Sequence, residues 1–148
     1  MVGGTVAKAR KSKKSSPAPA AAKPSRRASA LRAFIEAMPG AVPNVLSMGR
    51  SALPMAVIHK VEGKMFAIQS LRGEEYVILK CDPNLAQALR QQYKGVGHRS
   101  HLDKRFWIAV TLDADVPIKE VRRLVGHSYG LVCAGLTKKQ QAALDLKR

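Results

Sequence analysis

Residues 97–110, GHRSHLDKRFWIAV, combine residue types that serve two different chemistries. His98, His101 and Asp103 carry groups that ligate metals, whereas the basic residues and Trp107, the only tryptophan of the chain, suit contact with a nucleic acid. On a strand, His98 and His101 would point to opposite faces, and two histidines fall short of the usual three or four protein ligands. The neighbouring cations would also repel a metal ion. The pattern therefore disfavours a metal site.

The second half of this stretch predicts a strand over residues 106–112. Its alternation places Phe106, Ile108, Val110 and Leu112 toward a core, with Arg105 and Trp107 on the less apolar face. A cation and a flat aromatic ring two residues apart offer charge for a phosphate and a surface for a base. The alternative, in which Trp107 packs under a helix or under residues 41–53, stays open.

Other candidate groups for catalysis or nucleotide binding have simpler interpretations. His127 and Ser128 are adjacent on a predicted helix and diverge by about 100°, so they do not form a base and nucleophile pair. Residues 94–99, KGVGHR, lack the ending of a P-loop and favour a flexible loop, although their amides could contact a backbone phosphate. Asp113 and Asp115 suit turn and cap roles. We therefore expect no enzyme and no cofactor.

The charge balance of the chain points to a polyanionic partner. Its 148 residues include 26 Lys and Arg against 10 Asp and Glu, a formal net charge of +16. Such an excess favours nucleic acid or an anionic membrane surface. No apolar run approaches the roughly 18 to 20 residues of a membrane span. Cys81 and Cys133 lie outside any CxxC motif, so we expect two buried free thiols in a cytoplasmic protein.

Residues 1–30 are built almost wholly from Ala, Ser, Pro, Lys and Arg. A segment of this composition buries too little apolar surface to offset its ordering entropy, so we expect a disordered basic tail. A solubilising leader is the alternative, and a mitochondrial presequence is a less favoured one. The tail cations expected to contact DNA are Lys11, Lys13, Lys14, Arg26 and Arg27.

Residues 31–148 show the periodicities of one α+β domain. Leu31, Phe34, Ile35 and Met38 predict a helix that Pro39 and Gly40 end, and residues 41–53 predict a loop or a short helix. Residues 56–61, 64–69 and 76–81 predict three strands of an antiparallel meander, in which His59 is packed or partly buried. Asp82 and Pro83 begin another helix, residues 115–117 begin a third, and Thr137 with Gln140 forms the capping box of a last one.

Several strings in this order resemble the MmcQ/YjbR family of small bacterial proteins. They are GKMFAI at 63–68, VILKCDP at 77–83, HLDKRFWIAVTLD at 101–113, VPIKEVRRLVGHSYGLV at 116–132 and LTKK at 136–139. The resemblance implies a CyaY-like two-layer fold with a double-wing motif, an antiparallel sheet packed against helices, and a DNA-binding role. The basic tail is not part of the family domain.

The combined pattern leads to the hypothesis of a nonenzymatic, monomeric DNA-binding protein, associated with the nucleoid. Arg99, Lys104 and Arg105 would contact phosphates at one hairpin, beside Trp107. Lys60 and Lys64, which flank the Glu62-Gly63 turn, would do so at the other. RNA in place of DNA stays open. The alternative function is a small protein-interaction or ligand-binding adaptor for an acidic partner.

Overall fold

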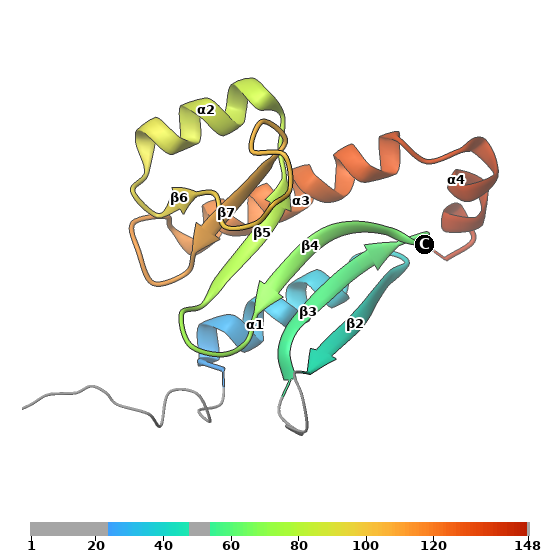
Figure 1. The fold of residues 1–148 in the computed structure, drawn as a ribbon. Coiled ribbons are helices and arrows are strands. Elements are labelled where there is room, and N and C mark those ends of the chain that lie inside the picture. The colour runs from blue at the N-terminus through green and yellow to red at the C-terminus, as the bar shows by residue number, and fades with distance from the viewer. Residues whose placement is uncertain (1–23, 48–53, 148) are drawn as a thin grey trace, which may run out of the picture.

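An antiparallel sheet with helices packed against it makes up the computed structural model, which describes residues 24–47 and 54–147 (Figure 1). The strand order is β2-β3-β4-β5-β7-β6. The strands are β2 (Ala41–Ser47), β3 (Pro54–Val61), β4 (Lys64–Ser70), β5 (Tyr76–Lys80), β6 (Val96–Gly97) and β7 (Trp107–Thr111). The helices are α1 (Arg26–Glu36), α2 (Pro83–Gln92), α3 (Ile118–Ala134) and α4 (Lys138–Asp145). The predicted α+β class is confirmed.

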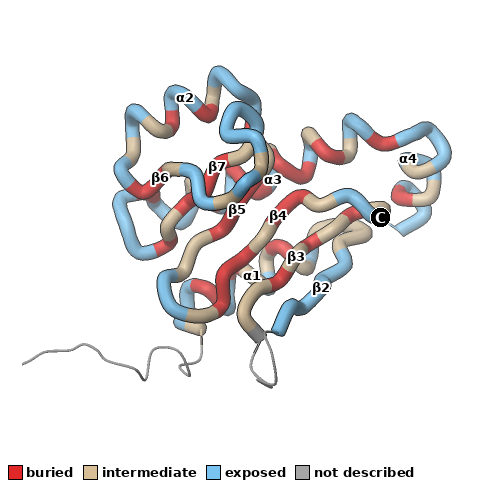
Figure 2. The backbone as a smooth tube through the Cα atoms, in the orientation of Figure 1, coloured by how far each residue is buried: buried red, intermediate tan, exposed pale blue. Residues whose placement is uncertain are grey.

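The two faces of the sheet are covered differently. Val77 pairs with Val110 and Leu79 with Ile108, and all four side chains are buried in the core cluster that also contains residues of α1 and α3. Figure 1 shows α1 and α3 behind the sheet, and Figure 2 shows that the edge strand β2 is largely exposed. On the opposite face, the cross-strand pair Lys80 and Trp107 is only half-buried. Because side chains alternate along a strand, one face carries the core and the other is partly open to solvent.

The first helix begins earlier than its apolar periodicity predicts. α1 starts at Arg26 rather than Leu31, and the Ser25 hydroxyl accepts a hydrogen bond from the Ala28 N–H at 3.0 Å. Arg27 donates to the Leu112 carbonyl at 3.1 Å, so it is bound to the folded domain and is not a tail cation. The prediction of a disordered segment over 1–30 is therefore wrong for residues 26–30. Lys11, Lys13 and Lys14 lie outside the described residues.

Two further predictions of local structure are wrong. Residues 41–47 form the edge strand β2, paired with β3 over its whole length, and not a loop or short helix. Phe106 precedes β7 and is 37 % exposed, with the Arg105 guanidinium 5.2 Å from its ring centroid, so it does not face the core. The buried residues of this strand are Ile108, Ala109 and Val110, followed by Leu112.

α2 and α4 begin where their capping residues predict, whereas α3 has no side-chain cap. The Asp82 carboxylate accepts hydrogen bonds from the backbone of Asn84 and Leu85 at the start of α2. Thr137 and Gln140 form the reciprocal bonds of a capping box at α4. α3 follows Pro117 and buries Val121, Leu124, Val125, Ser128, Tyr129 and Val132 along one face. Its length spans the sheet behind β4 and β5 (Figure 1).

His59 is a fully buried ionisable group in the core. Neither ring nitrogen has a hydrogen-bond partner among the described residues, and the Phe66 ring lies 6.3 Å away between centroids. Burial lowers the pKa of His59 to about 4, a shift that Glu36 of α1 partly opposes and Arg32 slightly reinforces. The predicted packed histidine is confirmed, and it is neutral at pH 7.

The buried His59 predicts a loss of stability in mild acid. Because its pKa is lower in the folded protein than the ordinary value of 6.5, the unfolded chain binds the additional proton, and stability falls as the pH drops through 6.5 toward 4. We expect a loss of about 2 kcal/mol in the free energy of unfolding between pH 7 and 5. Urea denaturation at both pH values measures it.

A matched pair of variants isolates this contribution. His59→Leu removes the titrating group, so its stability should change less between pH 7 and 5 than that of the wild type. His101→Leu changes an exposed histidine and should keep the wild-type dependence. Equal pH dependence in His59→Leu and the wild type would contradict the assignment.

Candidate functional site: a basic groove at Trp107

The candidate site arises where β4 and β5 separate. These strands pair only from Ala67 with Leu79 to Gln69 with Val77. Beyond that point, Ser128 of α3 connects them. Its hydroxyl donates to the Phe66 carbonyl at 2.6 Å and accepts from the Lys80 N–H at 2.9 Å. The buried hydroxyl therefore replaces a missing strand-to-strand hydrogen bond and leaves an opening with α3 behind it.

The opening is a groove of about 290 Å³. It is lined by residues from three strands and by the C-terminal part of α3. The strand residues are the first two of β4, the last of β5 and the first of β7. We call it the Trp107 groove, and its lining residues are Lys64, Met65, Lys80, Trp107, Leu131, Val132 and Gly135. Its lining combines apolar residues with one tryptophan and two lysines, and no acidic residue is among them.

Trp107 is held at the groove by its backbone. The Arg90 guanidinium of α2 donates to the carbonyls of Lys104 at 2.6 Å and of Trp107 at 2.9 Å. One residue earlier, the Phe106 carbonyl accepts from the Cys81 N–H at 2.7 Å. The side chain of Trp107 is half-buried. It is thus neither fully buried nor fully exposed, and Trp107 borders the groove.

The lysines around the groove have no ion-pair partners in the described part of the chain. They are Lys60, Lys64, Lys80 and Lys104. Lys60 pairs with Met65 across β3 and β4, which places it on the strand next to the groove. Lys80 is the direct cross-strand partner of Trp107. Uncompensated amines near an apolar groove form an anion-attracting surface.

The sequence interpretation missed Lys80. The signal was nevertheless present, because the alternation in YVILK puts Lys80 and Tyr76 on the face opposite Val77 and Leu79. The antiparallel register with WIAVT then brings Lys80 opposite Trp107.

Two predicted contact residues are already paired with carboxylates. The Arg105 guanidinium donates three hydrogen bonds to the Asp103 carboxylate, at 2.7, 3.1 and 3.2 Å, and this contact holds the pKa of Asp103 at about 2. Arg99 forms an ion pair with Glu74, and its guanidinium lies 4.6 Å from the centroid of the Tyr76 ring. Tyr76 begins β5 and Lys80 ends it, so Arg99 lies at the opposite end of that strand from the groove.

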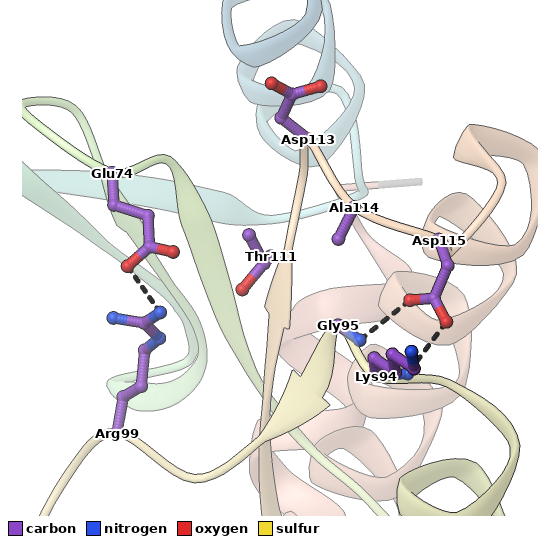
Figure 3. A pocket seen from close by; sticks show the side chains of 8 residues that line it. All are labelled: Glu74, Lys94, Gly95, Arg99, Thr111, Asp113, Ala114 and Asp115. Atoms are coloured by element: carbon purple, nitrogen blue, oxygen red, sulfur yellow. Dashed lines mark hydrogen bonds and ion pairs between the residues drawn. The ribbon is translucent and has the colours of Figure 1, made fainter.

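Figure 3 shows the hollow around Arg99, which has a volume of about 450 Å³. The Asp115 carboxylate accepts hydrogen bonds from the backbone N–H groups of Lys94 and Gly95, both at 2.7 Å. These bonds lower the pKa of Asp115. The amides that could have contacted a phosphate therefore already bind an internal anion. Glu74 and Asp113 also line this hollow, so its three carboxylates offset the charges of Lys94 and Arg99 and make it a poorer site for an anion than the Trp107 groove.

The groups considered for metal binding or catalysis have structural roles. The His98 ring nitrogen contacts the Leu102 carbonyl, and the His127 ring accepts from the Asp82 N–H at 3.3 Å. Ser128 is bound on both sides, as described above. Within residues 24–47 and 54–147, no three His, Cys, Asp or Glu side chains cluster as metal ligands. No helix in these ranges has the length and apolar character needed to cross a membrane.

Comparison with known proteins identifies the family. Residues 36–131 match the YjbR family model, which is more than half of the chain. The chain belongs to the YjbR family. It is 33 % identical over 85 residues to the uncharacterised protein YbdF of Escherichia coli O157:H7, spanning 57 % of this chain and 70 % of YbdF. It is 39 % identical over 71 residues to the uncharacterised protein YjbR of Escherichia coli K12, spanning 47 % and 60 %.

Solved structures support the same fold. A crystal structure of the Deinococcus radiodurans protein DR2400 is similar with a TM-score of 0.68 and 27 % identity, covering 78 % of this chain and 85 % of that one. A Pseudomonas syringae protein aligns with a TM-score of 0.56 at 20 % identity, over 70 % of this chain and 96 % of its own. The latter likeness concerns the fold alone. The predicted resemblance to the YjbR family is confirmed.

The Ser128 bridge predicts a specific loss of stability. Ser128→Ala leaves the Lys80 N–H and the Phe66 carbonyl without their partner inside the protein. We expect a decrease of about 1 to 3 kcal/mol in the free energy of unfolding, the usual penalty for an unsatisfied buried polar group. Urea denaturation followed by Trp107 fluorescence measures it. Ser29→Ala, at an exposed position of α1, is the control and should change stability by less than about 0.5 kcal/mol.

Proposed function

We propose that this YjbR family protein is a nonenzymatic DNA-binding protein that contacts DNA at the Trp107 groove and the lysines around it. The observation that carries the proposal is the set of four lysines without carboxylate partners, at the end of the sheet where β4 begins and β5 ends. Phosphates release condensed counterions when such amines neutralise them, and this release drives sequence-independent binding.

Additional cations lie near this surface. Gln140 of α4 donates to the Glu62 carbonyl in the β3–β4 turn, so the start of α4 lies against that turn. Lys138 and Lys139 there are exposed, and Lys64 is two residues from Glu62 in the chain. The surface proposed for the backbone contacts thus includes one predicted turn, at Lys60 and Lys64, and extends onto α4.

The predicted arginines have lesser roles in this proposal. Arg105 lies beside Lys104 and can exchange Asp103 for a phosphate at small cost, because exposed ion pairs contribute about 1 kcal/mol or less. Arg99 lies in the acid-lined hollow at the other end of β5, where a phosphate would meet Glu74 and Asp115. We therefore retain Lys104 and Arg105 as contacts and leave Arg99 out.

The absence of catalysis is inferred from the roles of the polar side chains. The Ser128 hydroxyl bridges two backbone groups, and one ring nitrogen of His127 is directed at the Asp82 amide. Burial also raises the pKa of the Cys81 thiol to about 11, so this cysteine is a poor nucleophile at neutral pH. These side chains favour a binding role over an enzymatic one.

A protein-interaction adaptor is the second candidate. The edge strand β2 favours it, since Val42, Val45 and Leu46 are all exposed. An unpaired strand edge with apolar side chains is suited to accept a strand from another protein. Val42→Lys with Val45→Lys distinguishes the two, because it should not weaken DNA binding if DNA contacts the groove. Weakened DNA binding would instead place the edge strand in the DNA interface.

Removal of the groove lysines should reduce both affinity and salt dependence. For Lys60→Gln, Lys64→Gln and Lys80→Gln combined, we expect the slope of log K against log salt to decrease in magnitude by about 2.7, from three lost phosphate contacts. Fluorescence anisotropy of a labelled DNA duplex across salt concentrations measures the slope.

The control for this variant changes the same amount of charge elsewhere. Lys94, Lys119 and Arg122 are exposed and lie away from the groove lining. Their combined replacement by Gln should alter the slope by clearly less. If both triple variants lose affinity and slope equally, the protein binds by net charge alone and the groove is not the contact surface.

The basic N-terminal segment should add to the salt dependence. Residues 1–23 contain six cations, Lys8, Arg10, Lys11, Lys13, Lys14 and Lys23. If all of them neutralise phosphates, deletion of residues 1–23 should decrease the slope by about 5. The deletion must not extend to residue 30, because Ala28 is part of the core and Arg27 binds Leu112. An unchanged slope would exclude the segment from the DNA contact.

A further inference from the structure

We propose that the Trp107 groove holds one unpaired nucleotide of a DNA strand, with the base against the indole ring and the phosphate at Lys64 and Lys80. This inference rests on the proposed function and specifies its ligand. It predicts a preference for single-stranded or locally opened DNA over a closed duplex.

The shape of the groove supports a single planar group. Its volume of about 290 Å³ is near the lower end of the range for small-molecule sites, roughly 300 to 1,000 Å³. A closed duplex cannot place a base face there, because neighbouring bases cover both faces of each base in the stack. An unpaired base has a free face, and stacking on an aromatic side chain is the usual way in which proteins hold such bases.

The chemistry of the lining separates the base from the phosphate. Met65, Leu131 and Val132 are apolar and suit the base, whereas Lys64 and Lys80 supply the positive charge. The C-terminal end of α3 also lines the groove, and the carbonyl groups at a helix C-terminus carry a partial negative charge. A phosphate is therefore disfavoured beside α3 and favoured at the lysines, so the base occupies the space next to the helix.

The position of Trp107 suits a preformed stacking surface. The Arg90 guanidinium fixes the carbonyl of Trp107 itself, and Lys80 flanks Trp107 directly across the sheet. Little ordering is therefore required when a base binds, which reduces the entropic cost of binding. The larger hollow at Asp115 lacks these features, because carboxylates line it and its amides are engaged.

The experiment uses the full-length protein and its single tryptophan as the reporter. Short oligothymidylate, a duplex of the same length and an abasic oligonucleotide of the same length are titrated at low salt. Trp107 emission and the anisotropy of the labelled oligonucleotide are recorded together. We expect oligothymidylate to quench the emission, and the duplex and the abasic strand to bind with clearly weaker quenching, because neither presents a free base face.

Three kinds of variant distinguish the contribution of the Trp107 ring from that of the lysine charges and from a general effect on the fold. Trp107→Leu should weaken binding of oligothymidylate roughly tenfold and leave duplex affinity nearly unchanged, with Trp107→Phe in between. Phe106→Leu, at the adjacent exposed ring, is the matched control and should keep the wild-type affinity. Lys64→Gln with Lys80→Gln retains the indole, so it should weaken binding but keep the quenching at saturation.

Each result that contradicts the proposal identifies which part of it is wrong. Binding of all three oligonucleotides by anisotropy, with Trp107 emission unchanged, would overturn the nucleotide site and leave DNA binding intact. Equal quenching by the abasic strand and oligothymidylate would show that no base occupies the groove. Quenching by thymidine monophosphate at the same concentration would assign the groove to free nucleotides and overturn a DNA strand as its occupant. An absence of any binding at low salt would overturn the DNA-binding function itself.

Discussion

The pair of hydrogen bonds made by the Ser128 hydroxyl determines the shape of the open side of this protein. β4 and β5 pair with each other over three residue pairs. At the next position, the Phe66 carbonyl and the Lys80 N–H bond to the Ser128 hydroxyl of α3 instead of to each other. A serine is suited to this position because one small side chain both donates and accepts. The separated strand ends expose part of α3, and the groove, the position of Lys80 and the half-buried state of Trp107 follow from that separation.

The charges of the domain are distributed unevenly along the strands. Glu74, Asp113 and Asp115 gather where β5 begins and β7 ends, and there they bind Arg99, Arg27 and two backbone amides. At the other end of the same two strands, the lysines of the groove have no such partners among the described residues. The two hollows therefore differ in electrostatic character, and the smaller one is the better site for an anion.

Local signals in the sequence predicted most of the helices and strands, and contacts distant in the sequence account for the failures. The caps at Asp82 and Thr137 and the apolar alternation of β4 and β5 depend only on residues close in the sequence. The predictions drawn from them are therefore correct. β2 contains Pro43 and Asn44 and lacks a clear pattern; it is a strand because β3 pairs with it. The start of α1 depends on Ser25 as a cap, and Arg27 binds Leu112, 85 residues away. The Ser128 bridge joins Phe66 and Lys80 of two different strands, 62 and 48 residues away, so no single segment reveals it.

The difference between arginine and lysine in this domain bears on what the groove can recognise. Five of the six ion pairs among the described residues use arginine, whose planar fork matches a carboxylate, while the groove is bordered by lysines. A lysine amine is a point charge that approaches a phosphate from many directions and makes no bidentate contact with a base edge. Stacking on Trp107 is similarly tolerant, since every base has an aromatic face. Under the proposed function, a groove built from these two elements should distinguish unpaired from paired nucleotides far better than one base from another, and any sequence preference would have to originate outside it.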